Sequence, residues 1–247
     1  MDFIESAINA NREVFGLLNS DFDEFLFCHM HENEEIRGAG GDRSLRIDVR
    51  AEEIFVSYLK KFGKINSEES GLIGEGEDEI ILDPIDGSSN IASCFPYYAS
   101  SISLKVRGKT IKSIVTNLAN GDFFVNDEGN FYKGSLISLK RINQMACVFP
   151  KIGIVEKAYA NPQLVARLHE TGMKFRSPGA VALSLAYARD VNFVIFAEKH
   201  RVYDVDAGLF LCDGLHRFVR EDFILVSREK KIFDTIKELI FSKGFGR

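Results

Sequence analysis

The sequence predicts a mixed α/β protein of two packed halves, because strand-like segments dominate its middle and helices alternate with strands later. Between residues 99 and 139 apolar residues recur with a period near two, and turn-forming pairs such as Arg107-Gly108 and Asn120-Gly121 interrupt them. This pattern is typical of antiparallel hairpins. After about residue 140, helical and strand-like stretches alternate. We therefore expect two α/β halves, residues 1–138 and 139–247, instead of a simple doubly wound sheet.

The individual elements follow from apolar spacing and from turn residues. Helical spacing predicts helices at residues 3–18, 22–29, 51–62, 162–170 and 180–188, near Asp204, and at 231–241. Residues 193–197 and 224–227 have the length and composition of strands. The glycine-rich segment 37–42 and the acidic segment 74–79 are expected to be loops.

Composition restricts the class of protein. The chain has 247 residues, 45% of them hydrophobic, which is enough to bury a sizeable core. With 31 basic and 36 acidic side chains the net charge is −5, so we expect no nucleic-acid partner. The longest apolar runs are far shorter than the roughly 18 residues of a membrane span, so we expect no membrane partner. Four scattered cysteines and an N-terminus without a secretion signal favour the cytoplasm.

Acidic residues are concentrated in four short segments that are expected to lie beside apolar strands. These segments are residues 46–48, 66–70, 81–90 and 202–208. In the third, Asp83 ends a predicted strand, and Pro84 cannot donate to a sheet, so the chain is expected to leave the sheet there. Asp86-Gly87 then favours a turn, and the following Ser-Ser-Asn offers helix caps whose free N–H groups can receive a phosphate.

Clustered carboxylates require a compensating positive charge. Two carboxylates about 5 Å apart repel by roughly 3 kcal/mol at an effective dielectric constant near 20. Oxygen ligands with few histidines nearby select magnesium or calcium, and a phosphate drawn to such ions is polarised for attack by water. Each acidic segment alone is more simply a turn or a solvated face. Their joint occurrence predicts metal-assisted hydrolysis of a phosphate ester.

Three motifs resemble the inositol monophosphatase and fructose-1,6-bisphosphatase superfamily. Residues 83–88 resemble its Asp-Pro-Ile/Leu-Asp-Gly-Thr/Ser motif, residues 68–70 resemble its Glu-Glu-Ser/Asp element, and residues 203–208 are similar to its Trp-Asp-x-Ala-Ala-Gly motif. The resemblance implies a layered αβαβα sandwich. The sequence differs from the family pattern at three positions: Ser88 replaces threonine, Tyr203 replaces tryptophan, and Asp206 replaces a small residue. Asp206 is expected to add negative charge beside the site.

The resemblance also implies roles for individual residues. Glu68, Asp83 and the carbonyl of Ile85 would hold a first Mg²⁺, and Asp83, Asp86 and Asp204 a second, with a third, weaker ion at Glu68. Ser88, hydrogen-bonded to Asp48, would orient the attacking water together with Glu68. The N–H groups of Gly87 and Ser88 would bind the phosphate. The residues expected on the substrate side are Gly179, Ala180, Glu198 and Arg201.

These roles predict Mg²⁺-dependent hydrolysis of a small polyol or sugar phosphate, with inositol-1-phosphate-like monoesters preferred. Fructose-1,6-bisphosphate and 3′-phosphoadenosine phosphates are the alternative substrates. The resemblance further implies a homodimer and inhibition by lithium. An alternative of another class is a regulatory binding protein that has kept the fold, although the complete set of acidic residues favours an enzyme.

A rival enzyme class is the haloacid-dehalogenase-type phosphatase, which uses an aspartyl nucleophile in an Asp-x-Asp motif. Asp204 and Asp206 have that spacing, but they lie too near residue 247 for the expected α/β core to follow. Asp83 and Asp86 are one residue too far apart for this motif.

Overall fold

The computed structural model describes residues 1–20, 36–37, 43–44, 46–142 and 147–241. The α-helices of these residues are α1 (Phe3–Ser20), α3 (Arg46–Leu59), α4 (Ser88–Ala92), α5 (Pro162–Glu170), α6 (Val181–Ala186), α7 (Val202–Leu211) and α8 (Lys230–Phe241). Short 3₁₀ turns are η1 (Lys60–Phe62), η2 (Ala158–Ala160) and η3 (Tyr187–Arg189). The helix predicted at residues 22–29 and most of the predicted loop at 37–42 lie outside the described residues.

The strands form two main sheets and one short ribbon in the described part of the chain. The larger sheet contains β3 (Lys64–Ser67), β4 (Gly71–Ile73), β5 (Glu79–Asp86), β6 (Ala99–Val106), β7 (Lys109–Asn117), β8 (Asp122–Asp127), β9 (Asn130–Ser135) and β10 (Arg141–Ile142). The smaller sheet contains β11 (Gly153–Glu156), β12 (Phe175–Arg176), β13 (Val194–Phe196), β14 (His216–Arg220) and β15 (Phe223–Ser227). The ribbon pairs β1 (Ile36–Arg37) with β2 (Arg43–Ser44).

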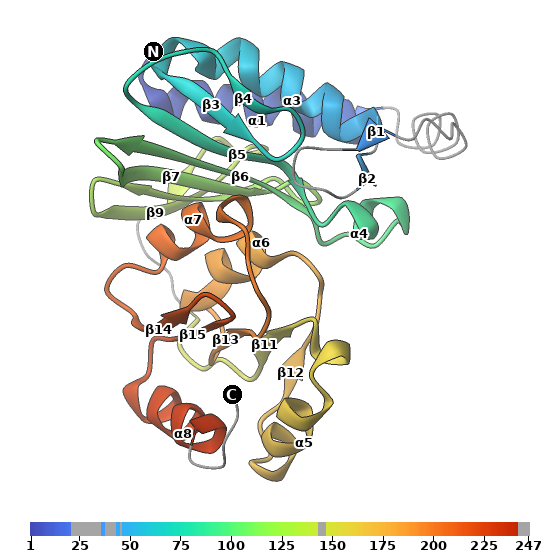
Figure 1. Ribbon diagram of the computed structural model, residues 1–247, viewed down its shortest axis with the longest axis vertical. Coiled ribbons are helices and arrows are strands. Elements are labelled where there is room, and N and C mark those ends of the chain that lie inside the picture. Colours follow the sequence, from blue (N-terminus) through green and yellow to red (C-terminus); the bar gives the residue numbers. More distant parts are fainter. Residues whose placement is uncertain (21–35, 38–42, 45, 143–146, 242–247) are drawn as a thin grey trace.

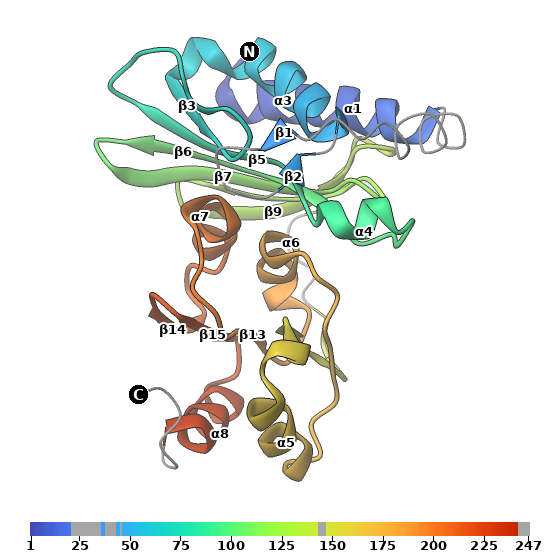
Figure 2. The ribbon, with the colours of Figure 1, turned by 45° about the vertical axis from the view of Figure 1, so that its right-hand side comes forward.

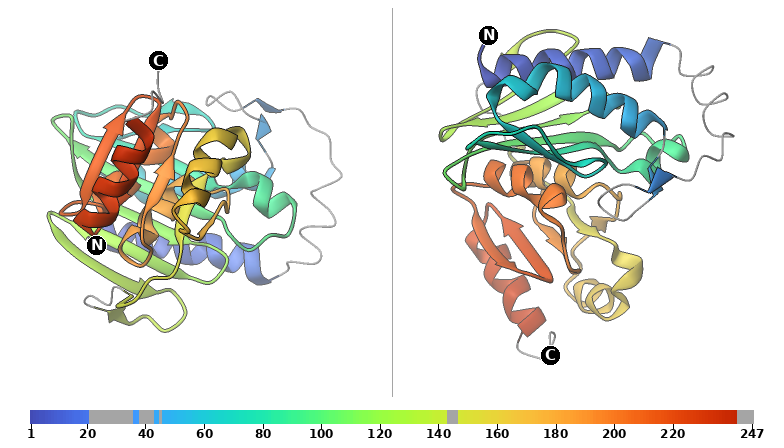
Figure 3. Two further views of the ribbon diagram at one scale, coloured as in Figure 1. Left: turned by 90° about the horizontal axis from the view of Figure 1, so that it is seen from below. Right: turned by 45° about the horizontal axis from the view of Figure 1, so that its top comes forward.

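Helices and sheets alternate in layers, as the predicted αβαβα sandwich requires. Helices α1 and α3 cover the outer face of the larger sheet, and α6 and α7 lie between the two sheets (Figures 1 and 2). Helices α5 and α8 lie side by side on the far face of the smaller sheet, which the view from below shows most directly (Figure 3). This order confirms the predicted fold. None of the helices in the described residues is long and apolar enough to cross a membrane.

The middle of the chain forms the antiparallel hairpins that the alternating pattern predicts. Strands β6 to β9 each pair with the next strand along the chain, and β10 extends this sheet a few residues past the predicted boundary at residue 138. Strand β5 pairs antiparallel with β6 but parallel with β3. In that parallel pair Ser67 lies opposite Leu82. The next residue of each strand, Glu68 after β3 and Asp83 within β5, therefore lies beside the other.

The prediction that the chain leaves the sheet at Pro84 was wrong. Strand β5 continues to Asp86, and the pairing register shifts between Asp83, opposite Ser101, and Asp86, opposite Ala99. This irregularity places Pro84 where no ladder hydrogen bond is needed from it. The turn follows only at residue 87.

The first acidic segment also lies in a different element from the one expected. Helix α3 begins at Arg46, before the predicted start at residue 51, so Asp48 lies in the first turn of a helix and not beside a strand. The helix buries Ile47, Ala51 and Phe55 against the larger sheet, whereas Asp48 is carried to the end of the helix that lies near Asp83.

Close packing between the two middle helices fixes the position of the last acidic segment. Gly208 in α7 lies against α6, and a Cβ atom at this position would lie 2.7 Å from the Cβ of Leu185. Any larger residue would force the helices apart. The small apolar side chains of Ala182 and Ala207 pack in the same layer, beneath Phe124 of the sheet. Helix α7 is therefore held close to the strands that carry Asp83.

Candidate active site

Three carboxylates from separate parts of the chain converge where α7 meets the larger sheet. Glu68 follows β3, Asp83 lies in β5 and Asp204 lies in the first turn of α7, and one carboxylate oxygen of each lies within 4.8 Å of the others. The backbone N–H of Glu68 donates to the carbonyl of Leu82 at 3.0 Å, which continues the parallel pairing of β3 with β5. The contact of α7 with β5 brings the third carboxylate to the group.

This group has the composition of a site for a hard divalent cation. Asp83 is only 2% exposed, and its Oδ1 atom has no hydrogen-bond partner among the described residues. A buried carboxylate without a partner costs free energy unless a cation or a proton compensates it. Carboxylate oxygens without histidine or cysteine are the donors that Mg²⁺ and Ca²⁺ prefer. The three residues therefore fit such an ion.

Burial and the charges of neighbouring acids raise the pKa values of Glu68 and Asp83. Burial is the largest cause of the rise in the pKa of Glu68 to about 7; the charge of Asp204 adds to it, and Arg201 opposes it. Burial likewise raises the pKa of Asp83, and the charges of Glu68, Asp86 and Asp204 add to the rise. Glu68 and Asp83 thus bind protons more tightly than isolated carboxylates would, which is the behaviour of buried acids whose charges are not fully compensated.

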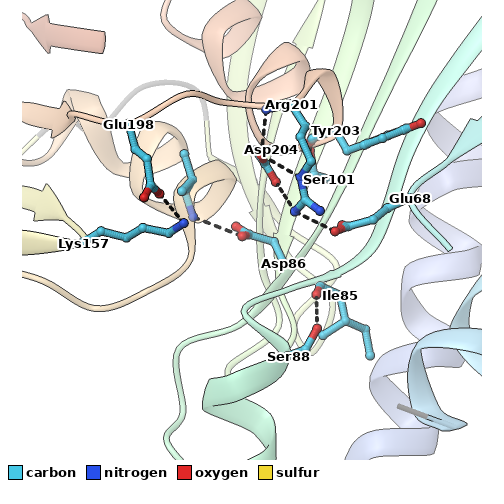
Figure 4. A network of polar contacts seen from close by, with 11 residues as sticks. Glu68, Ile85, Asp86, Ser88, Ser101, Lys157, Glu198, Arg201, Tyr203 and Asp204 are labelled. Atoms are coloured by element: carbon cyan, nitrogen blue, oxygen red, sulfur yellow. Dashed lines mark hydrogen bonds and ion pairs between the residues drawn. The ribbon is translucent and has the colours of Figure 1, made fainter. Parts of the chain in front are cut away.

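Arg201 contacts two of the three carboxylates. Its Nη2 atom lies 2.7 Å from Oε1 of Glu68 and 3.0 Å from Oδ1 of Asp204 (Figure 4). Its backbone N–H also donates to Oδ2 of Asp204 at 2.9 Å, which caps the start of α7. The side chain predicted to bind substrate therefore forms ion pairs with the predicted metal ligands.

Asp86 joins the larger sheet to the C-terminal half of the chain. Its Oδ1 accepts a hydrogen bond from the backbone N–H of Val181 at 3.0 Å, and its Oδ2 accepts one from Leu183 at 3.1 Å. Burial raises the pKa of Asp86, and the hydrogen bond from Leu183 opposes that rise. Asp86 lies beside the group of three carboxylates and is not one of its members (Figure 4).

Ile85, near the end of β5, lies next to the turn that contains Gly87 and to Ser88 at the start of α4. Gly87 has a φ of 97°, and a Cβ atom there would lie 3.1 Å from the carbonyl oxygen of Tyr97, so the turn requires glycine. The hydroxyl of Ser88 donates to the carbonyl of Ile85 at 3.1 Å, and not to Asp48 as the resemblance implies (Figure 4). Asp48 is 1% exposed, and its charge contributes to the raised pKa of Asp83.

The segment before α6 is fixed from both sides. The amide of Asn90 donates to the carbonyl of Pro178 at 2.8 Å, and the buried Oε2 of Glu156 accepts a hydrogen bond from the N–H of Gly179 at 2.9 Å. Gly179 and Ala180, both predicted to face substrate, therefore lie between α4 and β11, next to Gly87.

The predicted substrate residue Glu198 lies on the same side, after β13. Its carboxylate forms an ion pair with Lys157, and both side chains are partly exposed (Figure 4). The structure therefore places an acid and a base together at this edge of the site.

Comparison with known proteins identifies the family. The model of the inositol monophosphatase family matches residues 5–215, which include all three carboxylates. The chain belongs to the inositol monophosphatase family. It is 30% identical to a fructose-1,6-bisphosphatase of Pyrococcus furiosus over 188 residues, which are 73% of this chain and 71% of that protein. It is 28% identical over 225 residues to a fructose-1,6-bisphosphatase/inositol-1-monophosphatase of Archaeoglobus fulgidus, covering 84% and 81% of the two chains.

A solved structure shows the same fold. The IMPase of Thermotoga maritima superposes with a TM-score of 0.74 at 19% identity, covering 99% of this chain and 100% of that one. Membership of the inositol monophosphatase family makes the chain a phosphoric monoester hydrolase, as the acidic motifs predict. It also confirms that the three motifs belong to one family pattern.

One expectation for this family member was wrong. Asp206 does not add charge to the site but lies against the larger sheet, where its Oδ2 accepts hydrogen bonds from Ser103 at 2.6 Å and Thr110 at 2.8 Å. Its Oδ1 forms an ion pair with Lys105 at 2.8 Å. Asp206 is two residues from Asp204 on a helix, so the two side chains lie on different faces.

Sequence reasoning missed Glu156 and the structural role of Asn90. Glu156 is fully buried in β11, where its carboxylate also accepts the hydroxyl of Ser184. A single acid at the end of the apolar run Gly153–Glu156 was the available signal, because a charged residue in a buried strand requires a partner. Nothing in the sequence indicated that the partner is the segment before α6.

Proposed function

We propose that the chain hydrolyses a small polyol or sugar phosphate, with inositol-1-phosphate-like monoesters as the preferred class, in a Mg²⁺-dependent reaction. The observation that supports this most strongly is the group formed by Glu68, Asp83 and Asp204, in which a buried aspartate oxygen has no partner among the described residues. Fructose-1,6-bisphosphate is the second candidate, because two relatives at 28–30% identity carry that activity in their names.

In this proposal the N-terminal half supplies most of the metal ligands and the C-terminal half supplies Asp204. Glu68, Asp83 and the carbonyl of Ile85 would hold a first Mg²⁺. Asp83, Asp86 and Asp204 would hold a second, and a third, weaker ion would lie at Glu68. When bound, Mg²⁺ neutralises phosphate oxygens and makes a water molecule more acidic.

The remaining chemistry is assigned to groups of the chain. Because the hydroxyl of Ser88 donates its proton to Ile85, its oxygen is left to accept a hydrogen bond from the attacking water. Glu68 is assigned, together with Ser88, to orient that water. Asp48, buried close to Asp83, supports this arrangement. The N–H groups of Gly87 and Ser88 bind the phosphate, while Gly179, Ala180 and Glu198 contact the rest of the substrate.

A phosphate-release screen tests the proposal. Purified protein is incubated with inositol-1-phosphate, fructose-1,6-bisphosphate, 3′-phosphoadenosine 5′-phosphate and unrelated nucleotide phosphates, with Mg²⁺ or with EDTA. We expect release from inositol or sugar phosphates only with Mg²⁺, inhibition by lithium, and no trapped phosphoenzyme after acid quenching. Release that persists in EDTA, or a stable aspartyl phosphate, would contradict the mechanism.

The same preparation distinguishes an enzyme from a regulatory binding protein. If no phosphate ester in the panel is hydrolysed while Mg²⁺ still binds, the alternative of a binding protein that has kept the fold gains support. The homodimer that the family resemblance implies is tested on the same sample by light scattering after gel filtration.

A further inference from the structure

The ion pairs of Arg201 are unusual because they engage residues that fit a metal ion. The guanidinium lies 2.7 Å from a Glu68 oxygen and 3.0 Å from an Asp204 oxygen, and these two oxygens come from opposite halves of the chain. Both acids are largely buried, with 13% and 16% of their side chains exposed, whereas the arginine side chain is 36% exposed. A positive charge is therefore held on the more exposed side of the acidic group.

We propose that Arg201 is an exchangeable internal counter-cation, which holds Glu68 and Asp204 together before a divalent ion binds and releases them when the ion arrives. This inference rests on the proposed metal site. It adds a role for a residue that is not itself a metal ligand. A guanidinium and a divalent cation cannot both occupy the space between two acidic oxygens, since the like charges would repel each other at contact distance.

The start of helix α7 has a cap that uses the backbone of Arg201. The hydrogen bond that caps α7 is donated by the backbone N–H of Arg201 to Asp204, and this bond remains when the side chain is changed. The guanidinium can therefore leave Asp204 while this backbone cap remains. Its exposure leaves solvent on one side, into which it can swing on its flexible stem.

Two opposite effects follow for the metal-free and the metal-bound protein. Without an ion, Arg201 offsets part of the repulsion among the carboxylates, so its removal lowers stability. For ion binding, Arg201 is a competitor, so its removal makes binding tighter. An arginine that only stabilised the fold would affect the first property and leave the second unchanged.

Calorimetric titration tests the proposal on the whole chain, without substrate. Protein freed of metal with EDTA and desalted is titrated with MgCl₂, and with MnCl₂ as a second probe, at pH 8. We compare the wild type with R201M, which keeps the bulk of the side chain, and with R201K, which keeps the charge. K157M is the matched control, because Lys157 is a nearby cation that pairs with Glu198 and not with the three carboxylates.

We expect R201M to bind the ion about tenfold more tightly than the wild type, equivalent to about 1.4 kcal/mol. K157M is expected to stay within about twofold of the wild type, and R201K to lie between R201M and the wild type. In EDTA the thermal midpoint of R201M should be lower than that of the wild type, and saturating Mg²⁺ should close most of this gap.

Equal or weaker binding by folded R201M would overturn the proposal while leaving the proposed function intact. If K157M binds the ion as much more tightly as R201M does, the proposal is also overturned, because removing any nearby positive charge would then have the same effect. If the wild type binds neither ion, the metal site itself fails, and the proposed function fails with it. Circular dichroism confirms folding, and R201K supplies the comparison if R201M does not fold.

Discussion

The carboxylate of Asp86 accepts a hydrogen bond from the backbone N–H of Val181 at 3.0 Å, whereas Oδ1 of Asp83, in the same strand, has no partner among the described residues. The first aspartate is fixed to the start of α6, and the second faces other carboxylates. The two acids of one short motif therefore differ in their hydrogen bonds: two backbone N–H groups donate to Asp86, and none in the described residues donates to Oδ1 of Asp83. The same chemical change, Asp to Asn, should therefore destabilise the metal-free protein at position 86 and not at position 83.

Asp86→Asn should lower the free energy of unfolding of the metal-free protein by about 1–3 kcal/mol, because an amide has one acceptor oxygen in place of two and leaves one buried N–H without a partner. Urea unfolding in EDTA measures this difference. An unchanged free energy of unfolding would mean that the hydrogen bonds from Val181 and Leu183 do not hold the two halves together.

Asp83→Asn should leave the metal-free protein at least as stable as the wild type, because it removes a buried charge that its neighbours repel. It should also abolish Mg²⁺ binding and phosphate release. Calorimetry and the release assay measure these losses. Asp127→Asn is the matched control, since Asp127 lies at the end of β8 and pairs with Lys112. Phosphate release by Asp83→Asn at near wild-type rates would contradict the mechanism.

The metal-free protein should become less stable as the pH rises from about 5 to about 8. Glu68 has a pKa raised from 4.5 to about 7 in the folded chain, so the folded state binds its proton more tightly than the unfolded state. The stabilisation is complete below the unfolded value and is lost as the pH rises through the folded value. Thermal midpoints in EDTA at several pH values measure this slope. In Glu68→Gln the thermal midpoint should fall less steeply with pH. An equally steep fall in that variant would mean that other groups cause the pH dependence.

Ser88→Ala should lower kcat by about a hundredfold with KM changed less than about twofold, because the hydroxyl acts on water and not on bound substrate. Steady-state kinetics on the best substrate of the screen measures both constants. Ser93→Ala is the matched control, since that hydroxyl only donates to the carbonyl of Ser89 at the exposed end of α4. A change confined to KM would assign Ser88 to substrate binding.

Asp206→Ala should destabilise the protein by about 1–3 kcal/mol without reducing kcat of the folded fraction. The change leaves the hydroxyls of Ser103 and Thr110 and the ammonium of Lys105 without their shared acceptor. Urea unfolding and kinetics on the same preparation separate the two effects. A large loss of kcat with unchanged stability would indicate that Asp206 acts in the active site.

The fold was predictable because its signals are local. Period-two alternation predicted the antiparallel strands β6 to β9, and helical spacing predicted the bounds of α1, α5 and α8 to within a few residues. In β13 and β15 adjacent residues face different layers, since Val194 and Ile224 lie against α6 and α7 while Ile195 and Leu225 face the outer helices. Such runs are apolar on both faces and are predictable as buried strands.

The site was predictable only as far as its motifs extend. Glu68, Asp83 and Asp204 stand in recognisable sequence contexts, whereas the hydrogen bonds of Asp206 depend on β6 and β7 lying beneath α7. The same holds for Glu156 and for the ion pair of Arg201 with Glu68, in which the partners lie far apart in the sequence. A residue's type shows that it needs a partner, but the partner is set by the packing of the layers.

A crystal structure of the chain soaked in MnCl₂ tests the central claim most directly, because the anomalous signal of manganese locates the ion independently of the protein atoms. We predict a peak within bonding distance of carboxylate oxygens from Glu68, Asp83 and Asp204, with the guanidinium of Arg201 moved away from it. No peak there, with Arg201 still bound to Glu68 and Asp204 at saturating manganese, would contradict the account.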